Sequence, residues 1–144
     1  MKRQIILLVA LSLGLLSLSA HAAACTNASL KGVFGFESAV LQNNEVPPVF
    51  GEFVGLMRFD GVGNASISFV VVTSDGGGDD DVVVSWSYRV AADCTFTATQ
   101  DNGETFAGVL VRDGEEFFIV ETSRAAFGTP FVRRGHAIRV RTRT

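Results

Sequence analysis

The chain has 144 residues, of which 47% are hydrophobic, and a formal net charge of −3. A weakly acidic chain argues against binding to nucleic acid or to an anionic membrane surface. It also lacks the motifs of the familiar hydrolases, metalloproteases and nucleotide-binding enzymes, which argues against those functions.

The first residues are typical of a cleaved export signal. Lys2 and Arg3 form a basic start, an apolar run follows, and Ala20-His21-Ala22 fits the small-residue cleavage pattern. The apolar run is too short to favour a membrane-spanning helix. Loss of Lys2 and Arg3 with the signal takes the net charge from −3 to −5.

We therefore expect residues 1–22 to be a signal peptide and residues 23–144 to be one secreted or periplasmic domain that is not embedded in a membrane. In such an oxidising compartment, two cysteines are most simply a disulfide. The predicted bond joins Cys25 to Cys94 and ties the start of the domain to its middle.

Eight later segments alternate apolar and polar side chains, the pattern of strands with one buried face. Turns rich in Gly, Asn and Asp join most of them, and the clearest hairpin turn is Asp113-Gly114. The longest connection, residues 41–50, contains two prolines and is a candidate lid. In chain order, the predicted strands span residues 29–40, 51–59, 65–73, 82–94, 95–99, 105–112, 115–122 and 131–143.

The fourth of these segments contains the only tryptophan and the only tyrosine of the chain. Val82, Val84, Trp86 and Tyr88 share its apolar face. Eight such strands, with no convincing helix after the signal, predict an all-β fold: an antiparallel, eight-stranded up-and-down barrel. A β-sandwich is the alternative, because periodicity does not separate the two.

Three motifs stand out: Cys25-Thr-Asn-Ala-Ser-Leu-Lys-Gly-Val-Phe-Gly-Phe36, Phe59-Asp-Gly-Val-Gly-Asn64 and Tyr88-Arg-Val-Ala-Ala-Asp-Cys94. Together they resemble a group of exported bacterial proteins with no established activity. The resemblance covers most of the chain after the signal. It implies an exported single barrel and no particular chemistry.

A more distant resemblance concerns Leu30-Lys-Gly-Val-Phe34, which looks like the Gly-x-Trp start of lipocalin-like and avidin-like barrels. Those families place an arginine from the last strand over the tryptophan. The resemblance implies that Phe34 stands in for the tryptophan and that Arg139 or Arg141 stands in for the arginine. The barrels of the allene-oxide-cyclase type are a further analogy of shape.

The acidic loop over residues 74–81 offers a candidate cation site. Asp75, Asp79, Asp80 and Asp81 place hard oxygen ligands around three glycines, as calcium prefers. The spacing matches no EF-hand, and a solvated loop that blocks edge pairing is the favoured interpretation. We expect no metal and no cofactor.

One candidate catalytic cluster follows from the alternation of side chains along the strands, which decides the side chains that share a face. If His136 faces inward, it can meet Glu121 on the preceding strand, and Tyr88 can add a hydroxyl to the same cavity. The alternative is that His136 and Glu121 lie at strand ends, solvated or paired structurally.

A row of arginines occupies the last predicted strand. Arg139, Arg141 and Arg143 alternate, and we expect them on its outer face. Such a row can dock an acidic partner, or it can serve as a charged face that resists aggregation.

The favoured function is therefore that of an exported barrel that binds a small apolar ligand or a surface partner. Phe34, Phe36, Trp86 and Tyr88 are the candidate ligand-binding residues, because their shared parity points them inward. The alternatives are an isomerase or cyclase of the allene-oxide-cyclase type, and a structural or adhesion protein. The oligomeric state stays open.

Overall fold

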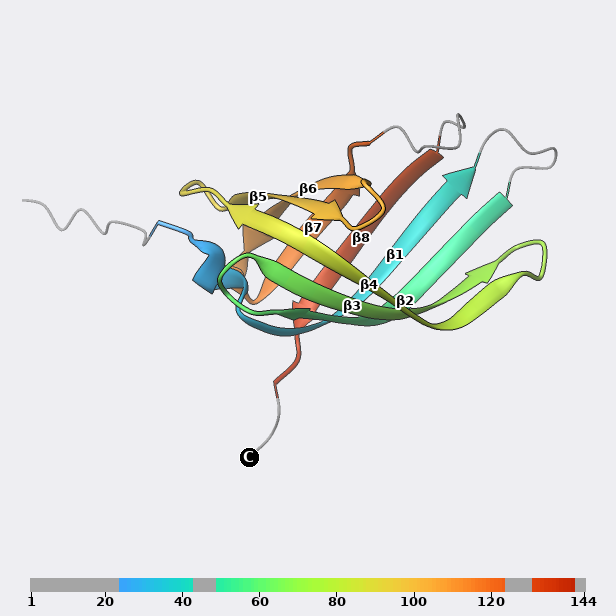
Figure 1. Cartoon of the computed structure of the whole chain (residues 1–144), viewed down its shortest axis with the longest axis horizontal. Helices are drawn as coiled ribbons and strands as arrows, with labels where there is room; N and C mark the ends of the chain where they lie inside the picture. The colour runs from blue at the N-terminus through green and yellow to red at the C-terminus, as the bar shows by residue number, and fades with distance from the viewer. Residues whose placement is uncertain (1–23, 43–48, 124–130, 142–144) are drawn as a thin grey trace, which may run out of the picture.

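The computed structural model describes residues 24–42, 49–123 and 131–141. Eight strands form a closed barrel in sequence order, and every neighbouring pair is antiparallel (Figure 1). This confirms the up-and-down barrel and rules out the sandwich. The strands are β1 Gly32–Gln42, β2 Val49–Phe59, β3 Asn64–Thr73, β4 Gly78–Val90, β5 Thr95–Gln100, β6 Thr105–Val111, β7 Glu116–Glu121 and β8 Phe131–Arg139.

Two short 3-10 helices, which the sequence did not predict, lie at one end of the barrel. They are η1 (Asn27–Leu30) and η2 (Arg112–Gly114). The second occupies the predicted hairpin turn, where Arg112 and Asp113 adopt positive φ angles of 51° and 56°. Gly114 also has a positive φ, and a Cβ atom there would lie 2.6 Å from the carbonyl oxygen of Ser29, so a larger residue would push η2 away from η1.

The fourth strand is displaced from its predicted position by four residues at each end. It begins at Gly78 within the acidic loop, and it ends at Val90 instead of Cys94. The register shifts between Phe69 and Val71 of β3, and Asp81 opposite has a φ of 58°. A bulge of this kind lets β4 continue through residues whose composition favours a loop.

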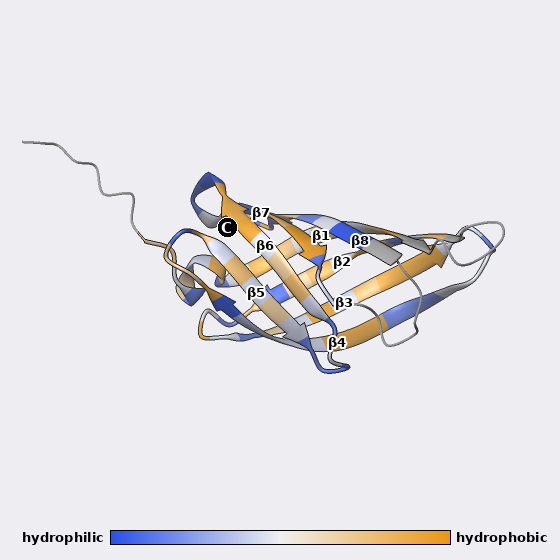
Figure 2. Ribbon diagram, turned by 90° about the horizontal axis from the view of Figure 1, so that it is seen from above, coloured by the Kyte–Doolittle hydropathy of each residue, from blue (hydrophilic) through white to orange (hydrophobic). Residues whose placement is uncertain are grey.

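The buried residues of β1 and β4 confirm the faces predicted for those two strands. In β4, for example, Trp86, Tyr88 and Val90 are buried, and the residues between them are exposed. Apolar residues follow the strands, and polar residues gather in the turns and on parts of β4 and β8 (Figure 2).

One half of the barrel interior is filled by aromatic rings. Phe117 is fully buried, and its ring centroid lies 5.2 Å from that of Phe34, 5.8 Å from Phe59 and 5.4 Å from Phe96. The contacts with Phe59 and Phe96 are edge-to-face, an arrangement that aromatic pairs prefer. This half of the barrel interior is therefore occupied by packed aromatic rings.

η1 and the adjoining turns cover this aromatic half of the barrel, and we call it the closed end (Figure 1). The predicted disulfide is present: Cys25 is bonded to Cys94, with a Cα–Cα distance of 4.9 Å. The side chain of Asn27 accepts a hydrogen bond from the Val90 amide at 2.8 Å and donates one to the Val62 carbonyl at 3.0 Å. These bonds fix η1 across the ends of β3 and β4.

The prediction that the arginine row lies on the outer face of the last strand is wrong for Arg139. Ala137 is 1% exposed and Ile138 is 53% exposed, so β8 turns Arg133, Gly135, Ala137 and Arg139 inward. The small Ala137 is thus packed against the aromatic interior, and the larger Ile138 lies on the outer face.

The Arg139 side chain lies inside the closed end of the barrel. Its guanidinium carbon lies 4.6 Å from the Phe34 ring centroid, which is the stacking expected of one of the two candidate arginines. The same guanidinium donates hydrogen bonds to the carbonyls of Lys31, Ser29 and Gly114. Arg141 lies past the end of β8 with an exposed side chain, and Arg143 lies outside the described residues.

Candidate ligand-binding cavity

The other half of the barrel, which we call the open end, contains a cavity of about 220 Å³. It lies where β1, β3, β5 and β7 finish. Most of its wall is apolar and aromatic. Prominent wall residues are Phe36, Met57, Ile67, Phe69, Trp86 and Phe106. An apolar cavity of about 150 Å³ holds benzene, so this one has room for a single ring with a short substituent.

Trp86 forms a rigid part of this wall. Its indole stacks on Phe106, with ring centroids 4.5 Å apart and an angle of 23° between the planes. The indole N–H donates a hydrogen bond to Oε1 of Gln100 at 3.1 Å. Stacking on one side and a hydrogen bond at the edge hold the ring in one position, which lowers the entropy cost of binding a ligand against it.

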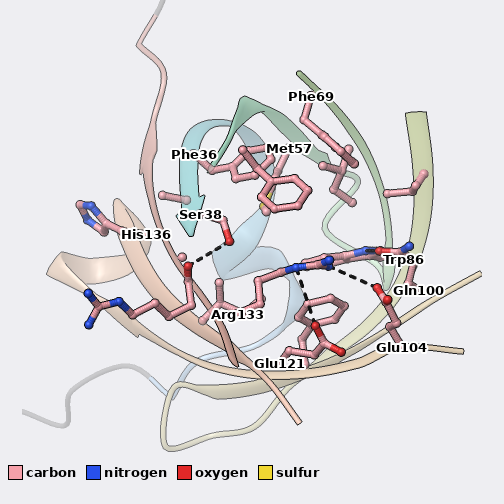
Figure 3. A pocket seen from close by; sticks show the side chains of 18 of the residues that line it. Phe36, Ser38, Met57, Phe69, Trp86, Gln100, Glu104, Glu121, Arg133 and His136 are labelled. Atoms are coloured by element: carbon pink, nitrogen blue, oxygen red, sulfur yellow. Dashed lines mark hydrogen bonds and ion pairs between the residues drawn. The ribbon is translucent and has the colours of Figure 1, made fainter. Parts of the chain in front are cut away.

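Five ionisable residues line the same cavity: Glu104, Glu121 and Arg133 point into it, whereas Arg134 and His136 alternate to the outer face of β8. Arg133 lies 3.3 Å from Oε2 of Glu104 and 3.7 Å from Oε2 of Glu121. Its guanidinium carbon also lies 4.9 Å from the Phe53 ring centroid. Figure 3 shows Arg133 reaching toward both carboxylates.

Glu121 is the most enclosed of the three, with a side chain only 3% exposed. Ser123 donates a hydrogen bond to its Oε1 atom at 2.9 Å. Burial raises the pKa of the Glu121 carboxyl, the hydrogen bond from Ser123 and the charge of Arg133 oppose the rise, and the charge of Glu104 adds to it. The Glu121 carboxylate is thus a buried group at the polar edge of a largely apolar cavity.

Of the four predicted ligand-binding residues, Phe36 and Trp86 line the cavity, and Phe34 and Tyr88 are absent from its lining. Phe34 is buried beneath Arg139 in the closed end. The Tyr88 hydroxyl accepts a hydrogen bond from the Gly61 amide at 3.0 Å, lies 3.3 Å from the Asn27 carbonyl, and has its pKa raised by burial. The structure therefore places these two residues outside the cavity, because a side chain that faces inward can lie at any depth along the barrel.

The structure does not bring together the three members of the predicted catalytic cluster. His136 lies on the outer face of β8, where Nε2 is 2.7 Å from Oε1 of Glu116 and the ring stacks on Phe118 at 4.8 Å. Figure 3 shows it pointing away from the pocket. Glu121 lies inside the open end, and the Tyr88 hydroxyl is at the closed end.

The acidic residues of the predicted loop do not converge. Oδ1 of Asp75 accepts hydrogen bonds from the Thr73 hydroxyl and the Gly77 amide, which hold the pKa of that carboxyl below its usual value. Asp79, Asp80 and Asp81 are successive residues of β4, where side chains alternate in direction. Within the described residues, no three His, Cys, Asp or Glu side chains are grouped so as to hold a metal ion.

Sequence reasoning missed Arg133, Glu104 and Gln100 as residues of the site. Arg133 had a usable signal, because it shares parity with the small residues Gly135 and Ala137. Small side chains suit a crowded barrel interior, so this face was the better candidate for the inward one. Glu104 and Gln100 flank a turn, and nothing in their local pattern distinguishes them from solvated polar residues.

No protein-family model and no curated protein matches the sequence. Among solved structures, a de novo designed fluorescence-activating beta barrel is similar over 76% of this chain and 93% of its own, with 18% identity and a TM-score of 0.43. A similarity of this size carries no argument about ligands or activity. In the described part of the chain, no helix has the length and apolar character needed to cross a membrane.

Proposed function

We propose that this protein is an exported barrel that binds a small, mostly apolar molecule in the cavity of its open end. The observation that carries the proposal is the contrast between the two halves of the interior. Aromatic rings fill the closed end, whereas the open end keeps about 220 Å³ free behind the fixed Trp86–Phe106 stack.

A void of this size has a physical cost. Protein interiors are packed as densely as organic crystals, and atoms that line a void lose dispersion contacts. A ligand with an apolar body restores those contacts, and the aromatic wall supplies the complementary surface. Export is supported by the signal-like start of the chain and by the Cys25–Cys94 disulfide, a bond that persists in oxidising compartments.

The test is a titration of the signal-free chain with 2-phenylethanol, an uncharged probe of about the right size. Trp86 is the only tryptophan, so its emission reports on the cavity wall directly. We expect a saturable change with a Kd in the range of roughly 10 μM to 1 mM, as suits a ligand of this size. No saturable change, by emission or by calorimetry, would overturn the proposal.

A matched pair of variants locates the binding. Val84 lines the cavity, and its neighbour Val83 is 65% exposed on the outer face of the same strand. Val84→Phe fills the cavity and should abolish 2-phenylethanol binding. Val83→Phe adds the same ring outside and should leave the Kd unchanged, so equal losses in both variants would place the probe elsewhere.

A further inference from the structure

The outer face of five neighbouring strands carries large apolar side chains. In barrel order these strands are β3, β2, β1, β8 and β7, and Figure 1 shows β2, β1 and β8 side by side. On one side of this face, Val72 and Val54 are 61% and 62% exposed. On the other side, Phe118 and Val120 are 48% and 43% exposed. A sheet face in contact with water normally presents polar side chains, so this surface is a candidate interface.

The strand registers arrange the side chains of this face in two rows across the five strands. In the order β3 to β7, the first row is Val72, Glu52, Ala39, Arg134 and Val120, and the second is Val70, Val54, Glu37, His136 and Phe118. A groove of about 780 Å³ follows the rows, and all of these residues except Val120 line it. We call the two rows the seam face, because the pairing of β1 with β8 runs through its middle.

The charges of the seam face are separated by sign. Glu37 and Glu52 lie on β1 and β2, Arg134 lies on β8, and all three side chains are exposed. Within the described residues, none of the three forms an ion pair. His136 has a structural contact instead, because its ring stacks on Phe118 and its Nε2 lies 2.7 Å from Glu116. The seam face thus has an acidic half and a basic half, with apolar side chains at both outer edges.

We propose that the seam face binds the seam face of a second copy of this protein, related to the first by a two-fold axis along the pairing of β1 with β8. Such a rotation lays the acidic half of each copy over the basic half of the other. It places Val54 of one copy opposite Phe118 of the other. It also places Arg134 of each copy between Glu37 and Glu52 of the other, opposite the small Ala39, which leaves room for the guanidinium.

The pattern favours a second copy over a partner of one sign. A strongly acidic partner would meet Glu37 and Glu52, and a strongly basic one would meet Arg134, so either would bring like charges together. A surface with both signs is complementary to itself when it is turned about a two-fold axis. Sheets that pack face to face lie about 10 Å apart, a distance that valine and phenylalanine side chains fill. The inference concerns the outside of the barrel and is independent of ligand binding in the cavity.

The test is sedimentation of the protein, expressed from its full-length sequence, at concentrations from about 1 μM to about 1 mM. We expect a monomer–dimer equilibrium with a Kd in the micromolar range, as suits a small interface with exposed charges. Arg134→Glu groups three carboxylates across the interface and should weaken the dimer roughly 100-fold or more. Arg89→Glu makes the same change at an exposed position of β4, away from the seam face, and should leave the Kd unchanged.

A mixture of two charge-reversed variants tests whether the occupant is a second copy. The double variant Glu37→Arg, Glu52→Arg should fail to dimerise alone, as Arg134→Glu does, because each brings like charges together. Mixed with each other, the two variants restore both sets of opposite charges. We therefore expect the mixture to form a dimer that contains one copy of each variant, identified by native mass spectrometry. Thermal melts check that both variants are folded.

Three results would overturn the proposal. One is a native protein that stays monomeric up to about 1 mM, which would leave the seam face to a different partner. Another is a dimer that survives Arg134→Glu, and the third is a mixture of folded variants that remains monomeric. If a charge-reversed variant does not fold, Ala39→Arg replaces it, because it sets a second cation against Arg134 of the other copy and should also weaken the dimer.

Discussion

Arg139 links several segments inside the closed end. It stacks on Phe34 and donates to three carbonyl oxygens, among them those of Ser29 in η1 and Gly114 in η2. Each of these carbonyl oxygens lies outside the strands, where no neighbouring strand can donate a hydrogen bond to it. One planar cation therefore completes the hydrogen bonding of both short helices, a task that suits the fixed fork of a guanidinium.

Replacement of Arg139 should lower the stability of the fold. Arg139→Lys keeps the charge, but a lysine cannot reach all three carbonyls while it lies over the Phe34 ring. We expect the free energy of unfolding to fall by about 2–4 kcal/mol, measured by urea denaturation. Arg141→Lys, at a side chain that is 80% exposed, should change it by less than about 0.5 kcal/mol. Equal effects would show that Arg139 contributes no more than a surface ion pair.

Glu121 should lower stability in a way that depends on pH. Burial holds its pKa above the usual value of 4.5, so the folded protein binds its proton more tightly than the unfolded chain does. The group therefore favours the fold below pH 4.5, and this contribution is lost as pH rises through its folded pKa. Glu104, Arg133 and Ser123 are the charged and bonding groups that face it.

Glu121→Gln, which does not titrate, should thus become more stable relative to the native chain as the pH rises from about 4 to about 7. Urea denaturation of both proteins across this range measures the difference. A difference that moves in the opposite direction would show that the ion pair with Arg133 outweighs burial.

At the scale of the strands, β2 and β3 approach each other closely at Gly55. A Cβ atom at this position would lie 2.7 Å from the Phe69 Cα atom and would also collide with the Ser68 carbonyl. Backbone atoms cannot move aside as a side chain can, so the contact requires glycine. The inward-facing Phe69, which lines the cavity, is positioned by this approach.

Gly55→Ala should therefore destabilise the barrel by about 2 kcal/mol or more. Gly35→Ala is the matched control in β1, because a Cβ atom there would meet only the Val140 side chain at 3.8 Å. Alanine at position 35 should be neutral or stabilising by up to about 1 kcal/mol. Thermal and urea unfolding of the two variants provide the measurement, and similar losses in both would contradict a specific clash at Gly55.

For the whole molecule, the disulfide closes a loop over a sequence separation of 69 residues. A bond of this span removes chain entropy from the unfolded state, and the double variant Cys25→Ser, Cys94→Ser should lose about 4 kcal/mol. Hydrogen exchange should show the loss of protection first in η1, which the bond anchors. The Kd of the folded variant for 2-phenylethanol should stay the same, since the cavity lies at the other end. A weakened Kd would mean that the two ends are coupled.

The architecture could be predicted because eight segments with a period of two and hairpin turns leave few ways to hide the sheet edges. The disulfide followed from the number of cysteines. The boundary of β4 could not be predicted, because a bulge at Asp81 carries a loop-like composition into a strand. The candidate lid, residues 43–48 in particular, lies outside the described residues.

The site was harder to predict than the fold, for a physical reason. Parity gives two faces, and in β8 each face contains arginines, so hydrophobicity does not identify the inner one. Ile138 and Val140 look like core residues, yet the crowded interior accepts Ala137. The alternation of side chains also says nothing about depth along the barrel. Phe36 and Phe34 both face inward, but Phe36 lines the cavity and Phe34 lies in the closed end.

The seam between β1 and β8 has a consequence for when the protein can fold. Arg139 bonds to Ser29 across 110 positions of sequence, and the same seam is the only pairing that turns an open sheet into a barrel among the described strands. A growing chain therefore carries two unpaired edges until β8 has left the ribosome. Such a chain cannot close before β8 is available, and its unpaired edges need protection from aggregation until then.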